Sequence, residues 1–134
     1  MDDAQKKAQE MYMEFHMLSQ HIQQMQKQLE MITTQLMELK VTSNSLDEFK
    51  KLPAGRETLI PLSSGIFAKA TLKDSKELLV NIGANVVVKK DIESTKELIT
   101  KQFEDMKKFQ KQLIEELEQK SAQAESLETD VSAG

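Results

Sequence analysis

The residue types that most often carry catalysis or bind metals do not occur here at the spacings such chemistry requires. The two histidines, His16 and His21, are five residues apart, whereas a helical metal pair needs a spacing of three or four. The chain has no cysteine, which excludes a thiol nucleophile and a cysteine zinc site. Gly65 and Gly83 have no phosphate-binding motif around them. We therefore predict no catalytic residue, no cofactor and no metal site, in a protein that is not an enzyme.

Composition points to long helices that pair with other helices. Charged residues make up 30% of the 134 residues and aromatic residues only 4%, a balance typical of coiled coils. The pI of about 5.3 and net charge of −4 argue against a nucleic-acid-binding protein. No apolar run reaches the roughly 18 residues of a membrane span, and the polar N-terminus does not resemble a signal peptide. We expect a cytoplasmic protein that binds neither nucleic acid nor membranes.

Residues 4–50 are predicted to form an N-terminal coiled-coil helix. Apolar residues recur there at alternating steps of three and four, which is a heptad pattern that requires a partner helix along its length. The predicted seam of this helix consists of Phe15, Leu18, Ile22, Met25, Leu29, Ile32, Leu36 and Leu39.

Residues 91–128 are predicted to form a second coiled-coil helix, and residues 129–134 a flexible tail. Asp91 is the candidate N-cap, with Ser94 and Thr95 as alternatives. Polar Lys96, Gln110 and Lys120 interrupt its core positions, which costs stability and can fix the register. Its seam consists of Ile99, Phe103, Met106, Leu113 and Leu117. Because the segment between the helices reverses the chain, we expect the two helices to run antiparallel.

Residues 57–89 are predicted to be a small β hub of about four short strands in two hairpins. Short apolar runs alternate there with turn residues, and Pro61 indicates an edge or a bulge. A sheet this small is barely stable alone, so we expect the hub to assemble with strands of other subunits. The candidate assembly residues are Leu59, Ile60, Leu62, Ile66, Phe67, Leu72, Leu78, Val80, Ile82, Val86 and Val88. The predicted fold class is mainly α, with a long antiparallel two-helix coiled coil and this β hub between the helices.

This order of elements resembles the α-type subunits of prefoldin, a hexameric chaperone. The resemblance is carried by three segments of the hub, at Leu59–Leu62, Ser64–Phe67 and Ile82–Asn85. The last of these turns, Gly-Ala-Asn-Val, lacks the second glycine and the aromatic residue of many α-type subunits. The ending Val-Val-Lys-Lys-Asp looks more like archaeal members of the family.

The resemblance implies that two α-type subunits join through their strands and recruit four β-type subunits. It also implies that nonnative polypeptides are held at the coiled-coil tips without ATP and passed to a group II chaperonin. The alternative function is a structural coiled-coil tether, or a self-assembling filament or oligomer subunit, that binds no client.

Four apolar residues near the free helix ends are candidates for client binding. Tyr12, Met13 and Met17 fall outside the heptad seam, and Leu127 lies near the end of the second helix. Methionine is flexible and polarizable, which suits a surface that accepts varied apolar sequences. The competing interpretation is that these side chains make ordinary packing contacts at a fraying tip.

Overall fold

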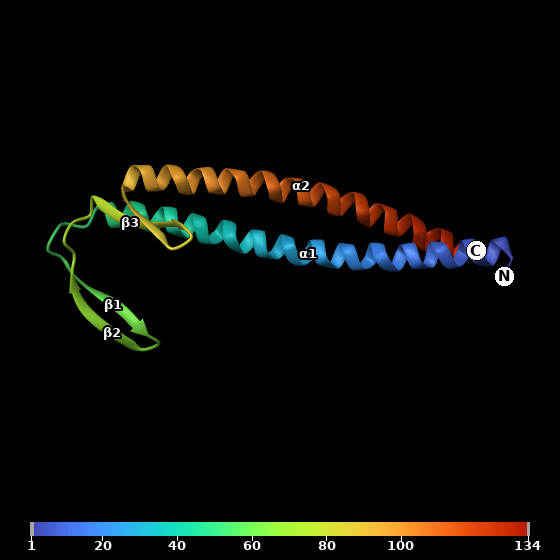
Figure 1. Ribbon diagram of the computed structural model, residues 1–134, viewed down its shortest axis with the longest axis horizontal. Coiled ribbons are helices and arrows are strands. Elements are labelled where there is room, and N and C mark those ends of the chain that lie inside the picture. Colours follow the sequence, from blue (N-terminus) through green and yellow to red (C-terminus); the bar gives the residue numbers. More distant parts are fainter. Residues whose placement is uncertain (1, 134) are drawn as a thin grey trace. The chain divides into compact units, whose positions relative to one another are not determined.

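The computed structural model describes residues 2–133, and its elements follow the predicted order (Figure 1). The bounds are α1 Asp3–Lys50, β1 Glu57–Ser63, β2 Ile66–Thr71, β3 Glu77–Gly83, β4 Val86–Asp91 and α2 Ile92–Ala133. Two long helices with two antiparallel hairpins between them confirm the predicted fold class. The second helix is longer than predicted, because α2 continues past residue 128 to Ala133.

The described residues form two compact units, and both helices contribute to each. The terminal unit comprises the residues up to Met37 together with those from Asp105 onward, and the hub unit comprises Glu38–Glu104. The terminal unit therefore consists of paired helices, and the hub unit carries both hairpins.

In the terminal unit, α1 and α2 lie side by side and antiparallel, as predicted (Figure 1). Gln110 Nε2 lies 3.3 Å from Thr33 Oγ1, and His21 Nε2 lies 3.9 Å from Glu116 Oε1. Along the pair, residue numbers on α2 therefore increase in the direction in which those on α1 decrease. The start of α1 and the end of α2 consequently lie together at one end of the pair.

The predicted seam lies between the helices. Every predicted seam residue is buried or half-buried, and the buried ones are Met25, Ile32, Leu36, Ile99 and Leu113. Burial of this apolar stripe is the main force that holds the helices together. Gln110, one of the polar residues in the seam, donates to Thr33, so a polar interruption is satisfied by the facing helix.

In the hub unit, charged side chains align the two helices. Lys96 Nζ donates to Asp47 Oδ1, and Lys50 Nζ lies 2.5 Å from Glu93 Oε1. The start of α2 is capped as predicted, because Asp91 Oδ1 accepts the Ser94 backbone N–H at 2.6 Å. This hydrogen bond holds the pKa of Asp91 below its usual value.

The four strands form two separate two-stranded sheets. β1 pairs with β2 and β3 pairs with β4, both antiparallel. The β1–β2 ladder shifts register between Pro61 and Ser63, at the residue that indicated an edge or a bulge. The turn of the second hairpin places Ala84 and Asn85 at φ of 50° and 62°, as a two-residue type I′ turn requires.

Candidate binding groove and assembly hairpins

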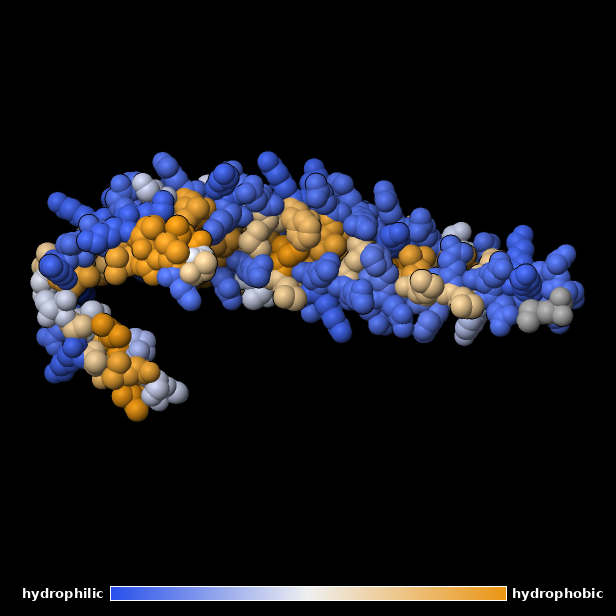
Figure 2. All heavy atoms as spheres, in the orientation of Figure 1, coloured by the Kyte–Doolittle hydropathy of each residue, from blue (hydrophilic) through white to orange (hydrophobic). Residues whose placement is uncertain are grey.

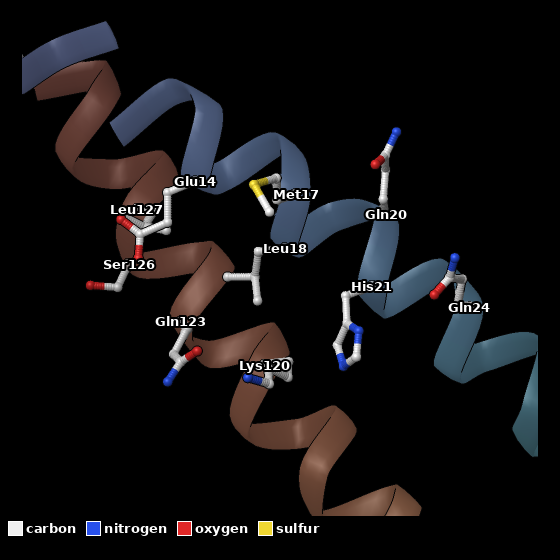
Figure 3. Close-up of a pocket in the computed structure, with 10 residues that line it drawn as sticks. All are labelled: Glu14, Met17, Leu18, Gln20, His21, Gln24, Lys120, Gln123, Ser126 and Leu127. Atoms are coloured by element: carbon white, nitrogen blue, oxygen red, sulfur yellow. The ribbon is translucent and has the colours of Figure 1, made fainter. Parts of the chain in front are cut away.

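A groove of about 750 Å³ lies between the helices of the terminal unit, near the joined helix ends (Figure 3). Leu18 points from α1 toward α2 within it. The groove is lined by Glu14, Met17, Leu18, Gln20, His21 and Gln24 of α1 and by Lys120, Gln123, Ser126 and Leu127 of α2.

The groove lies where the seam lacks large apolar side chains. The α2 core positions between Leu117 and Leu127 hold Lys120 and Ala124 rather than large apolar residues. A small or polar residue there cannot fill the space opposite Leu18, so the helices leave an opening instead of a packed core. Lys120, which interrupts the apolar seam, is also one of the residues that line the groove.

The lining combines an apolar surface with side-chain amides. Met17, Leu18 and Leu127 offer apolar contact, and Gln20, Gln24 and Gln123 offer both donors and acceptors. Such a surface can bind an apolar side chain while its amides hydrogen-bond the main chain of an extended peptide. The flexible thioether of Met17 can adapt to different side chains.

The structure brings together two of the four candidate client-binding residues. Met17 and Leu127 line the groove from opposite helices, and Met17 is 67% exposed. Tyr12 and Met13 are 65% and 60% exposed but do not line the groove. They lie within two helical turns of Met17 along α1.

The candidate assembly residues are divided between exposed and half-buried positions. Figure 2 shows apolar side chains gathered over the hairpins, whereas much of the helix surface is hydrophilic. The exposed candidates are Leu59, Ile60, Leu62, Ile66, Phe67, Ile82 and Val86, and the half-buried ones are Leu72, Leu78, Val80 and Val88. Exposed large apolar side chains in such number on small hairpins are typical of surfaces that bind other proteins.

Two exposed hairpin residues were missed by sequence reasoning. Leu79 is 71% exposed and Val87 is 54% exposed, yet the alternation of residues assigned Leu78, Val80 and Ile82 to the apolar face of β3. The sequence did contain a signal for these two residues. Leu79 and Val87 follow Leu59 and Phe67, two of the candidate assembly residues, at a spacing of twenty residues.

Within residues 2–133, no cluster of histidine and acidic side chains could hold a metal ion. In the same range, neither helix is long and apolar enough to cross a membrane.

An antiparallel helical pair that connects through two exposed β-hairpins defines a two-helix coiled-coil protein with a small β hub. The prefoldin family, described as "Prefoldin subunit", matches residues 18–133 of the chain. The chain therefore belongs to the prefoldin family, which is a family of chaperones and not of enzymes.

Its relatives include two archaeal proteins named prefoldin subunit alpha. The one from Methanococcus aeolicus is 32% identical over 123 residues, which cover 92% of this chain and 83% of the relative. The one from Thermofilum pendens is 25% identical over 118 residues, covering 88% and 92%.

A solved structure has the same fold. A chain in the cryo-EM structure of filamentous PFD from Methanocaldococcus jannaschii matches with a TM-score of 0.76 at 16% identity. The match covers 86% of this chain and 95% of that chain.

Proposed function

We propose that this chain is an α-type prefoldin subunit that holds nonnative polypeptides without ATP. The observation that carries the proposal is the groove in which Met17 and Leu127 face the same opening, with Tyr12 and Met13 exposed nearby. Because the groove leaves apolar surface exposed to water, it can bind an apolar segment of a nonnative client. The client would bury that segment in its own core once folded.

The proposed mechanism depends on several weak contacts. In a hetero-hexamer of two such subunits and four β-type subunits, each helix pair offers one groove, and the client bridges several of them. Affinity then comes from multivalency, while each single contact dissociates readily. Release of this kind suits transfer of the client to a group II chaperonin without an energy source.

Two pairs of methionines on α1 allow a matched test. Met13 and Met17 are 60% and 67% exposed, and Met31 and Met37 are 63% and 65% exposed. Of these four methionines, Met17 lines the groove and Met13 lies one helical turn before it on α1, whereas Met31 and Met37 do not line it. The variants M13Q/M17Q and M31Q/M37Q therefore each remove two thioether side chains of similar exposed fraction, from different places on α1.

Each variant is mixed with a β-type prefoldin subunit, and aggregation of a client diluted from denaturant is followed by light scattering. We expect M13Q/M17Q to need several-fold more chaperone for equal protection, and M31Q/M37Q to match the parent. If the two double variants protect equally well, the groove is not the client site.

A second candidate function is a self-assembling subunit that binds no client. It is favoured by the exposed hairpins and by the similarity to a chain from a filamentous assembly. The mass of the chain mixed with β-type subunits separates the two. A discrete hexamer that protects clients supports the chaperone, and an open-ended polymer without protection supports the self-assembling subunit.

A further inference from the structure

Methionine is the only sulfur-containing residue of this chain and its most readily oxidised side chain. The sequence holds eight methionines, no cysteine and no tryptophan. Among residues 2–133, the methionine side chains differ widely in their access to water. Met25 is 3% exposed, Met11 and Met106 are half-buried, and the exposed ones are Met13, Met17, Met31 and Met37.

Oxidation of a methionine by a peroxide is a balanced two-electron step. A lone pair of the thioether Sδ attacks one oxygen of hydrogen peroxide, so that an S–O bond forms as the O–O bond breaks. The sulfur is oxidised to a sulfoxide, and the peroxide is reduced and leaves as water. Two thiols of a sulfoxide reductase can return the two electrons, which releases the oxygen as water and leaves a disulfide on the reductase. The modification is therefore reversible.

Met17 is the exposed methionine whose oxidation changes the groove. Its thioether lies on the α1 wall, and the other large apolar side chains of the lining are Leu18 and Leu127 (Figure 3). Leu18 and Leu127 are half-buried, whereas Met17 is 67% exposed. Met17 therefore supplies the most exposed apolar side chain of the groove.

A sulfoxide at this position turns that apolar side chain into a polar one. The sulfoxide oxygen accepts hydrogen bonds and donates none, so it is stable only in water or beside a donor. Gln20, Gln24 and Lys120 line the same groove and carry donor N–H groups. An apolar client segment would have to displace water or these donors from the oxygen, and its affinity for the groove falls.

We propose that Met17 is a reversible oxidation site and that its sulfoxide weakens client binding at the groove. This inference rests on the proposed function, and it names a regulation of the same site. Reduction of the sulfoxide restores the thioether and with it the apolar contact.

The fold survives this oxidation because the seam shields its own methionine. Met25 is buried between the helices at 3% exposure, so a peroxide reaches its sulfur only when the helices separate. A sulfoxide there would place a polar group in the apolar seam and destabilise the pair. Brief treatment with dilute peroxide therefore alters the groove before it alters the fold.

Met31 and Met37 are matched controls within the same helix. They are 63% and 65% exposed, so a peroxide reaches them as readily as it reaches Met17. Neither lines the groove. Their oxidation makes the surface of α1 more polar without changing the groove.

The test treats the isolated chain with hydrogen peroxide, removes the oxidant, and then adds an untreated β-type prefoldin subunit. Peptide mass spectrometry maps the sulfoxides, and light scattering follows aggregation of a client diluted from denaturant. The readout is the amount of chaperone needed for equal protection after peroxide, divided by the amount needed before it. Because this ratio compares each variant with itself, any effect of the substitution before oxidation cancels.

Leucine supplies an apolar side chain that a peroxide does not oxidise. In the variant M13L/M31L/M37L, Met17 is the one exposed methionine left among residues 2–133. We expect the ratio to rise several-fold for the parent and for this triple variant, and to stay unchanged for M17L. A methionine sulfoxide reductase should return the oxidised parent to its starting value. Helical circular dichroism and the melting temperature should not change while Met25 remains a thioether.

Three results would overturn the proposal. The first is an unchanged ratio in the triple variant although Met17 is mapped as a sulfoxide, and the second is a rise in M17L equal to that of the parent. The third is a fall in melting temperature that parallels the loss of protection, which would assign the effect to the fold. Failure of the proposed function is distinguishable, because equal protection by M13Q/M17Q and M31Q/M37Q is measured without peroxide.

Discussion

The buried seam of the terminal unit predicts that removal of a smaller side chain destabilises the protein more than removal of a larger one. Leu113 is only 5% exposed, whereas Phe109, one helical turn away on α2, is 53% exposed. The comparison of L113A with F109A therefore tests which face of α2 packs against α1. That face also determines which residues line the groove.

The expected magnitudes follow from burial. Leucine-to-alanine changes in cores cost about 2–5 kcal/mol, and the seam of a two-helix pair can partly collapse, so about 2–3 kcal/mol is expected for L113A. Half of the Phe109 side chain is already in water, so its loss costs about 1–1.5 kcal/mol. Alanine has a more favourable helix propensity than phenylalanine by about 0.5 kcal/mol. The net cost expected for F109A is therefore about 1 kcal/mol or less.

The measurement is urea unfolding followed by helical circular dichroism, at one protein concentration because assembly contributes to stability. With a slope of about 2 kcal/mol per molar urea, L113A should lower the midpoint by about 1–1.5 M and F109A by about 0.5 M or less. If F109A lowers the midpoint as much as L113A, the seam has been assigned to the wrong face.

Two further predictions concern the hub unit. The Ser94 N–H holds the pKa of Asp91 below its usual 3.8, so the cap stabilises the fold above that value and is lost as pH falls through the folded pKa. The melting temperature of the parent should therefore drop between about pH 5 and pH 2, and that of D91N should drop less; parallel curves would exclude a titrating cap. In the second turn, Ala84 has φ of 50°, a region that costs residues with a Cβ about 1 kcal/mol. Hydrogen exchange of the β3 and β4 amides should slow in A84G and quicken in A84V, and unchanged rates in both would show that this turn does not limit hairpin opening.

The helices and hairpins could be predicted because their signals are local. Heptad spacing marks the seam residues within a few turns of one another, and Pro61, Gly65 and Asn85 mark the bulge and the turns. The Asp91 cap likewise depends on a residue three positions away. Such patterns need no knowledge of the rest of the chain.

Two features escaped prediction for definite reasons. The end of α2 was placed at residue 128 because the apolar pattern stops near Leu127, but a helix continues through backbone hydrogen bonds that need no apolar residue. Leu79 and Val87 were missed because both faces of the hairpin carry apolar side chains. A period of two then cannot show which face is covered.

By itself, the sequence determined the two helices, their seam, the paired hairpins and the absence of cysteine chemistry, since each depends on residue type and short-range spacing. Only the tertiary structure decided that Met17 and Leu127 share one groove, because antiparallel pairing joins residues from opposite ends of the chain.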